Sequence, residues 1–377
     1  MRKTNIAIID ADLIGIKRHR FPNLACMKLS GYWKDKGNTV SLKTDYESLE
    51  QFDKVLISKV FLDTHISDSV LNKNNVEYGG TGFFYDKAPT LPNEIEHHIP
   101  DYHLYDKWVE TQIESGVKVK ELEYYTDYSI GFTTRKCFRQ CGFCVNKNYK
   151  KVEKHSPLNE FYDPSRKYIC LLDDNVLGHP DWKGIIAELQ QTGRYFQYKQ
   201  GMDERLLNDE KAEMLSMSKY KGDYIFAFDN IEDAELIKSK LRLWRRYCSK
   251  TTKFYVFCGF SRLDIWDEFF WKQDILDTFK RIKVLMEHGC LPYIMRFARY
   301  KESPYKGMYI NLARWCNQPS FLKKKSFREF CVANGESSST MKYLNDFERQ
   351  YPGIANKYFD MKYEQLNKYG KEVKAVS

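Results

Sequence analysis

The chain has 377 residues and a formal net charge of +9, and 42% of its residues are hydrophobic. It is too long for one small core and too apolar to be disordered, so we expect two or three folded domains. No stretch reaches the length of a membrane span, and Asp10 and Asp12 interrupt the short apolar stretch near the start. These features exclude a disordered or membrane-spanning protein and favour a cytoplasmic protein without a membrane partner.

The first part of the chain alternates strand and helix patterns. The apolar positions between Leu24 and Gly37 repeat near the helical period. Apolar strands joined by helices imply a parallel sheet with helices on its faces, so we expect residues 1–125 to form a small doubly wound α/β domain. The apolar runs that predict its strands are residues 5–9, 39–42, 54–61 and 76–83.

A second series of strand patterns begins after residue 125, with helical patterns such as residues 182–193 and 209–222 between its members. Six βα units of this kind curve into a partial (β/α)6 TIM-like barrel or a long open sheet, with ligands beyond the carboxyl ends of the strands. We expect the partial barrel over residues 126–300 and a basic, mostly helical segment over residues 301–377. The six runs are residues 128–134, 167–173, 194–200, 223–229, 253–260 and 291–297.

Positive charge is concentrated in two places. Residues 134–154 carry a net charge of +6, and residues 301–377 also carry +6. One interpretation is an anionic partner near both segments, and the other is ordinary solvated faces of helices and loops. Because Tyr and Phe are interleaved with the basic residues, nucleic acid or a nucleotide is the anionic substrate that we consider.

Three of the ten cysteines, Cys137, Cys141 and Cys144, lie in the run RKCFRQCGFC, directly after a predicted strand. A structural zinc site usually has four ligands in paired hooks, and no second CxxC completes this one. A redox pair would leave Cys137 without a role, and bacterial ferredoxins use four cysteines at another spacing. Three thiolates leave one position of a metal centre open, as catalysis requires. The alternative is a non-catalytic nucleic-acid-binding protein with zinc or a structural cluster.

The run CFRQCGFC resembles the CxxxCxΦC signature of radical SAM (S-adenosylmethionine) enzymes, with Phe143 at the aromatic position, and the six-unit series resembles their partial barrel. The resemblance implies that Cys137, Cys141 and Cys144 bind three irons of a 4Fe-4S cluster and that the fourth iron holds S-adenosylmethionine. Reduction by a flavodoxin- or ferredoxin-type partner would then generate a 5′-deoxyadenosyl radical that abstracts hydrogen from the substrate. The reaction that follows this step stays open.

The resemblance also points to polar residues at the ends of later strands. The family receives the amino group of S-adenosylmethionine at a Gly-Gly-Glu-like segment, and the corresponding acidic segment here, LLDDNVLG, offers Asp173 and Asp174. The alternative for both is a turn or a helix cap. Asp203, Arg205 and Asp229 follow the third and fourth strands and are further cofactor-binding candidates, with salt bridges between neighbouring units as the alternative.

The N-terminal segments resemble the Rossmann-like, cobalamin-binding module of cobalamin-dependent radical SAM enzymes. The cobalamin-ligating DxHxxG pattern is absent, because residues 10–15, DADLIG, contain no histidine. This absence argues against bound cobalamin, although family members can bind it without that histidine, and a cobalamin-dependent radical SAM methyltransferase is the alternative function. Methylthiotransferases resemble this architecture too, but only Cys26 precedes the cluster here. We interpret Cys316 and Cys331 as buried thiols rather than auxiliary ligands.

Overall fold

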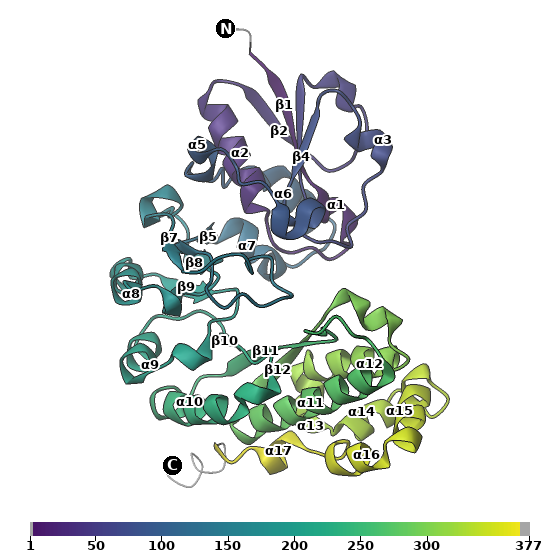
Figure 1. Ribbon diagram of the computed structural model, residues 1–377. Coiled ribbons are helices and arrows are strands. Elements are labelled where there is room, and N and C mark those ends of the chain that lie inside the picture. Colours follow the sequence, from purple (N-terminus) through teal and green to yellow (C-terminus); the bar gives the residue numbers. More distant parts are fainter. Residues whose placement is uncertain (1–2, 370–377) are drawn as a thin grey trace. The chain divides into compact units, whose positions relative to one another are not determined.

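The computed structural model describes residues 3–369 and divides into two compact units (Figure 1). Unit 1 comprises Met1–His179 and Glu188–Gln197, and unit 2 comprises Pro180–Ala187 and Tyr198–Ser377. The first two and last eight residues of the predicted domain ranges lie outside the described residues. The division falls within the range predicted for the barrel, and the three-domain boundaries stay a prediction.

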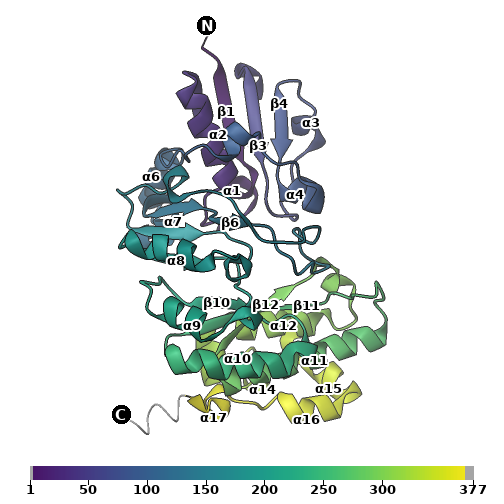
Figure 2. The ribbon, with the colours of Figure 1, turned by 60° about the vertical axis from the view of Figure 1, so that its left-hand side comes forward.

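Unit 1 begins with a parallel sheet that has the order β2-β1-β3-β4 (Figures 1 and 2). All four strands coincide with predicted apolar runs, so this part of the expected α/β domain is confirmed. The strands are β1 (Asn5–Asp10), β2 (Thr39–Lys43), β3 (Lys54–Ser58) and β4 (Val76–Gly79), and the helices of this part are α1 (Ala11–Gly15), α2 (Leu24–Asp35), α3 (Asp68–Leu71), α4 (Thr81–Phe84), α5 (Asn93–Glu96), α6 (Asp106–Glu114) and α7 (Glu123–Thr126).

The central strand β1 is buried on both faces. Ile6 and Ile8 pack in one apolar cluster with Leu24 of α2, whereas Ala7 and Ile9 pack in a second cluster on the other face. Successive side chains of a strand point to opposite faces, so the continuous apolar run predicts this double burial. The packing confirms that the sheet is covered on both sides.

Unit 1 also contains the first three strands of the second series, in a sheet of order β5-β8-β9. The strand predicted at residues 128–134 ends at Gly131, where the ring of Phe161 would lie 2.2 Å from an added Cβ atom. Thr134–Arg135 instead forms β6, which pairs antiparallel with β7. The bounds are β5 (Tyr128–Gly131), β7 (Glu153–Lys154), β8 (Tyr168–Leu171) and β9 (Tyr195–Tyr198), with helix α8 (Trp182–Gln191) between the last two strands.

Unit 2 contains the other three strands of the series, in a parallel sheet of order β10-β11-β12. All six predicted strands are therefore present, but they lie in two sheets, and one continuous partial barrel stays a prediction. The bounds are β10 (Tyr224–Ala227), β11 (Thr252–Cys258) and β12 (Leu291–Arg296), with α9 (Asp209–Ser216), α10 (Ala234–Tyr247) and α11 (Glu268–Glu287) between and before them.

The described part of the C-terminal segment is helical after β12, as the sequence predicts. Cys316 and Cys331 are buried there, with at most 1% of their surface exposed, which agrees with their interpretation as core thiols. Among residues 3–369, no helix combines the length and the apolar character needed to cross a membrane. The helices are α12 (Lys306–Cys316), α13 (Pro319–Lys324), α14 (Phe327–Val332), α15 (Ser339–Gln350), α16 (Pro352–Tyr358) and α17 (Tyr363–Leu366).

Candidate cluster site

The three cysteines lie on one loop of unit 1 that follows the carboxyl end of β5. The ribbon of β6 and β7 closes the base of this loop, because Thr134 pairs with Lys154 and Arg135 pairs with Glu153. Inside the loop, Lys136 and Gln140 have φ angles of 71° and 50°, a left-handed conformation that is uncommon for residues other than glycine. We call residues 133–147 the cysteine loop.

The sulfur atoms of the cysteine loop differ from the other thiols of the chain. Cys137, Cys141 and Cys144 are partly exposed, whereas the remaining seven cysteines are buried, and none of the ten forms a disulfide. The sulfur of Cys137 accepts a hydrogen bond from the backbone N–H of Arg139 at 3.5 Å, and that of Cys144 accepts one from Asn146 at 3.4 Å. Donors to sulfur of this kind tune iron–sulfur clusters.

A single zinc ion and an iron–sulfur cluster place different demands on the positions of their ligands. A single zinc ion requires every sulfur to lie about 2.3 Å from one point. Within the described part of the chain, no three His, Cys, Asp or Glu side chains converge closely enough to ligate one ion. The ligands of a multi-iron cluster each bind a different iron and need not converge on one point. Three thiolates are a donor set that an iron–sulfur cluster can use, and the zinc alternative stays open.

Asp173 lies two residues after β8 and holds the start of the cysteine loop. Its Oδ1 accepts the N–H of Thr133 at 2.9 Å, and its Oδ2 accepts the N–H of Thr134 at 2.6 Å and both threonine hydroxyls at 2.6 and 2.7 Å. Only 3% of Asp173 is exposed. Burial raises the pKa of Asp173 to about 6, against the opposing effect of the four hydrogen bonds.

Asp174 contacts the middle and the end of the same loop. Its Oδ2 accepts the N–H of Lys136 at 2.7 Å, and its Oδ1 accepts the side-chain amide of Asn146, also at 2.7 Å. Burial raises the pKa of Asp174, while the bond from Lys136 and the charge of Arg135 oppose the rise. The predicted contact of Asp173 and Asp174 with the ammonium group of S-adenosylmethionine is not tested by these distances and stays a prediction.

Sequence reasoning missed several residues that shape the loop. Asn175 donates its side-chain amide to the sulfur of Cys137 at 3.5 Å, and Asn146 reaches Asp174. Thr133 and Thr134 supply the donors that Asp173 accepts. The only sequence signal for them was the position of polar residues beside the cysteines and immediately after a buried strand.

Phe143 and Lys147 connect the cysteine loop to the segment after α4 in the same unit. The hydroxyl of Tyr85 donates to the backbone carbonyl of Phe143, and Lys147 forms an ion pair with Asp86 at 3.0 Å. Lys147 also lies over the ring of Tyr85, with its nitrogen 5.5 Å from the ring centroid. The aromatic position of the motif is thus held through its backbone.

Much of the positive charge near the cysteines is paired within unit 1. Lys136 pairs with Glu153 at 2.7 Å, and Arg135 pairs with Glu96 at 3.2 Å. Burial opposes ionisation of Glu96, but a hydrogen bond from His155 and the charges of Lys28 and Arg135 lower its pKa to about 2. These pairs favour the structural interpretation of the basic run, and the anionic substrate stays a prediction.

The remaining candidates, Asp203, Arg205 and Asp229, lie in unit 2. Arg205 bonds Asp203 through Nε at 2.7 Å and pairs with Asp233 at 2.8 Å, which is the salt-bridge alternative stated for them. Asp229 accepts the N–H of Phe257 at 3.1 Å. Because these residues and the cysteines belong to different units, their meeting at one cofactor stays a prediction.

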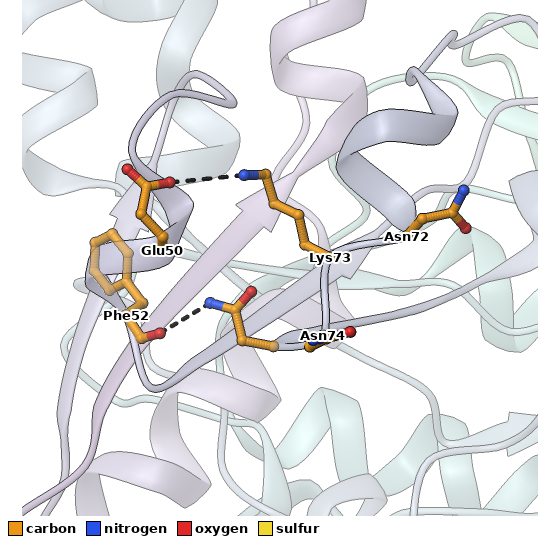
Figure 3. Close-up of a pocket in the computed structure, with 6 residues that line it drawn as sticks. Glu50, Phe52, Asn72, Lys73 and Asn74 are labelled. Atoms are coloured by element: carbon orange, nitrogen blue, oxygen red, sulfur yellow. Dashed lines mark hydrogen bonds and ion pairs between the residues drawn. The ribbon is translucent and has the colours of Figure 1, made fainter.

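A surface pocket of about 440 Å³ lies elsewhere in unit 1 (Figure 3). It is lined by residues 50, 52 and 72–75, and Glu50 and Lys73 form an ion pair across it at 3.6 Å. These segments precede β3 and β4. Ligands of parallel sheets bind beyond the carboxyl ends of the strands, so we assign no function to this pocket at the amino ends.

No model of a known protein family matches the sequence, and no curated protein does. A solved structure does resemble the chain: the radical S-adenosylmethionine methyltransferase TsrM from Kitasatospora setae with cobalamin and a [4Fe-4S] cluster bound. The TM-score is 0.50 at 11% sequence identity, over 78% of this chain and 75% of that one. The chain has the fold of this enzyme. The mixed α/β fold expected from the sequence agrees with this neighbour, and one continuous partial barrel stays a prediction.

Two further structures are similar at lower scores. TsrM with tryptophan substrate and the S-adenosylmethionine analogue aza-SAM bound gives a TM-score of 0.48 at 11% identity, over 77% of this chain and 72% of that chain. The cobalamin-dependent S-adenosylmethionine radical enzyme OxsB, in its apo form, gives 0.38 at 12% identity, over 100% of this chain and 61% of that chain.

Proposed function

We propose that the protein is a radical SAM enzyme in which Cys137, Cys141 and Cys144 hold a 4Fe-4S cluster. The observation that carries the proposal is a loop with three partly exposed thiols, at the carboxyl end of a parallel strand, in a chain with this fold. When bound, the cluster supplies the electron that cleaves S-adenosylmethionine and yields a 5′-deoxyadenosyl radical. A flavodoxin- or ferredoxin-type protein would deliver that electron in the cytoplasm.

The chain's own residues would hold the two cofactors. Backbone and side-chain N–H groups of Arg139, Asn146 and Asn175 donate to the sulfurs of the cysteine loop. Each carboxylate oxygen of Asp174 accepts one hydrogen bond and can accept another. In the proposed complex, these oxygens accept the ammonium group of S-adenosylmethionine. Phe143 would contact the cofactor in the same complex, and Asp203, Arg205 and Asp229 stay predicted cofactor-binding residues.

The proposed substrate is an anionic molecule such as nucleic acid or a nucleotide. The support for it is the net charge of +6 in residues 301–377. Steeply salt-dependent binding of a single-stranded oligonucleotide to the full chain would agree with this substrate class, and binding that salt does not weaken would contradict it.

Anaerobic reconstitution with iron and sulfide tests the central proposal. We expect about four iron atoms per chain, the broad visible absorbance of a cluster, and 5′-deoxyadenosine after addition of dithionite and S-adenosylmethionine. Alanine at Cys137, Cys141 or Cys144 should abolish all three, whereas Cys331→Ala, a buried thiol of unit 2, should retain them. One equivalent of zinc with no 5′-deoxyadenosine would instead support the non-catalytic nucleic-acid-binding protein.

A cobalamin-dependent methyltransferase is the second candidate, because TsrM, whose fold the chain shares, has cobalamin bound. In this chain Val60, Phe61 and Leu62 are about half exposed just beyond the carboxyl end of β3, where parallel sheets bind ligands. We expect hydroxocobalamin to remain with the protein through gel filtration. Loss of the cobalamin would remove this candidate and leave the radical SAM proposal intact.

A further inference from the structure

Three consecutive residues after β8 all contact the cysteine loop, at different positions. Asp173 bonds its start, Asp174 bonds Lys136 and Asn146, and Asn175 bonds the sulfur of Cys137. All of these contacts lie within unit 1. The loop is therefore attached to the end of the neighbouring strand as well as to its own strand.

Asp173 directs four hydrogen bonds to the cysteine loop. Its Oδ2 accepts three of them and its Oδ1 accepts one, all from Thr133 and Thr134. Its 3% exposure leaves the carboxylate enclosed by protein. A cofactor ammonium group would have to displace a bond that the loop needs, and the displaced backbone N–H would then be buried without an acceptor.

Asp174 holds the middle and the end of the cysteine loop through its bonds to Lys136 and Asn146. The bond to Lys136 fixes a residue with left-handed backbone directly before Cys137, and the bond to Asn146 fixes the residue two positions after Cys144. Such a backbone conformation is uncommon for lysine and needs surrounding contacts to hold it. The stretch that carries all three cysteines is thus held on both sides.

We infer that Asp173 is a positioning residue that sets the geometry of the cysteine loop and that it does not bind S-adenosylmethionine. This inference rests on the proposed function in so far as the loop holds a cluster. Asp174 and Asn146 complete the attachment, so that the three thiols stand in place before any cofactor arrives.

The experiment compares Asp173→Asn with Asp12→Asn in the full chain. Whichever way its amide is turned, Asn at 173 places an NH2 group against the backbone N–H of Thr133 or of Thr134, so at least one of these two backbone bonds is lost. Asp12 is a matched control, because it is also buried, at 1% exposure, and accepts bonds from Val60, Phe61 and Thr64 away from the cysteine loop. Asn146→Ala removes a single bond from a partly exposed side chain and should fold even if Asp173→Asn does not.

Two measurements are made on each variant. In the cluster-loaded protein, we expect iron to pass to a chelator roughly tenfold faster in Asp173→Asn and a few-fold faster in Asn146→Ala, with wild-type rates in Asp12→Asn. The dissociation constant of S-adenosylmethionine for the loaded fraction should equal that of the wild type in all three. A cluster retained normally in Asp173→Asn with lost S-adenosylmethionine binding would overturn the inference.

Hydrogen exchange of the apo-protein separates this inference from the proposed function. We expect the amides of residues 133–147 to exchange roughly tenfold faster in Asp173→Asn, whereas Asp12→Asn should change exchange around residues 60–64 and not in the cysteine loop. If the wild type takes up no cluster, the proposed function fails while this comparison still stands. If loop exchange in Asp173→Asn equals that of the wild type, the positioning role fails even in a protein that binds the cluster.

Discussion

Glu204 of unit 2 is a buried carboxyl whose two oxygens have no hydrogen-bond partner among the described residues, and none of its surface is exposed. Burial raises its pKa well above the ordinary value of 4.5, the neighbouring Asp203 adds to the rise, and the charges of Arg245 and Lys240 oppose it. The folded protein therefore holds a proton on Glu204 at pH values where the unfolded chain releases it.

The sign of the effect on stability follows from this linkage. A raised folded pKa costs no stability below pH 4.5, and the cost grows as the pH rises toward the folded pKa. Between pH 4.5 and the folded pKa, each pH unit costs about 1.4 kcal/mol. Glu204→Gln removes the proton requirement and keeps the shape. We expect the variant to gain almost no free energy of unfolding at pH 4.5 and to gain more as the pH rises above 4.5.

Urea unfolding of the apo-protein, followed by tryptophan fluorescence between about pH 4.5 and pH 8, measures this difference. Glu336→Gln is the control, because this glutamate is exposed and its replacement should change the free energy of unfolding by less than about 0.5 kcal/mol. A Glu204→Gln variant that is no more stable than wild type at pH 7, or a gain that does not grow with pH, would refute the reasoning.

Three further predictions concern charged residues. The pKa of Glu96 is lowered to about 2, so its ionised form contributes up to about 3 kcal/mol to the free energy of unfolding above pH 4.5, and this contribution is lost as the pH falls toward 2. In an acid titration, Glu96→Gln should therefore lose less of its free energy of unfolding than the wild type does. Lys147 pairs with Asp86 whereas Lys150 is exposed, so Lys147→Glu should speed hydrogen exchange in the cysteine loop and Lys150→Glu should not; equal effects would contradict this. Arg281, 2% exposed, donates to four backbone carbonyls, and Arg281→Met should lower the free energy of unfolding by roughly 3 kcal/mol or more, measured by urea unfolding.

The sequence was sufficient for the strands because their burial leaves a direct pattern. The run IAIID becomes β1 with alternate residues in two apolar clusters, and the six later runs all become strands. The strand β5 ends early, at Gly131, where the ring of Phe161 packs against the glycine, a contact between residues thirty positions apart in the chain. Local patterns carry no information on such contacts.

The candidate site, too, could be predicted from the sequence only in part. The three cysteines stand out in the sequence, because thiols are rare and their spacing is specific. The contacts of Asp173, Asn146 and Asn175 are invisible there, since each joins residues 28 to 40 positions apart. A carboxylate after a strand can cap a turn, pair with a cation or hold a neighbouring loop, and only the geometry distinguishes these roles.

Asp174 is the residue in which the loop and the cofactor would compete, and this gives the last prediction. Asp174→Ala and Asn146→Ala both remove the 2.7 Å bond between these side chains. Their effects on hydrogen exchange of the cysteine loop should therefore be non-additive, with a double variant that hardly exceeds Asp174→Ala alone. Additive effects would show that the two residues hold the loop independently.

Asp173 and Asp174 should differ in their effect on the binding of S-adenosylmethionine. Asp173 is buried against the loop with four accepted bonds, whereas Asp174 is partly exposed and accepts one bond on each oxygen, so Asp174 is the carboxylate that an ammonium group can reach. In cluster-loaded protein, Asp174→Asn should weaken S-adenosylmethionine binding roughly tenfold or more, as expected for a lost charge-assisted bond, while Asp173→Asn leaves it unchanged. Equal affinities in both variants would place the ammonium contact on another residue and leave Asp174 with the loop alone.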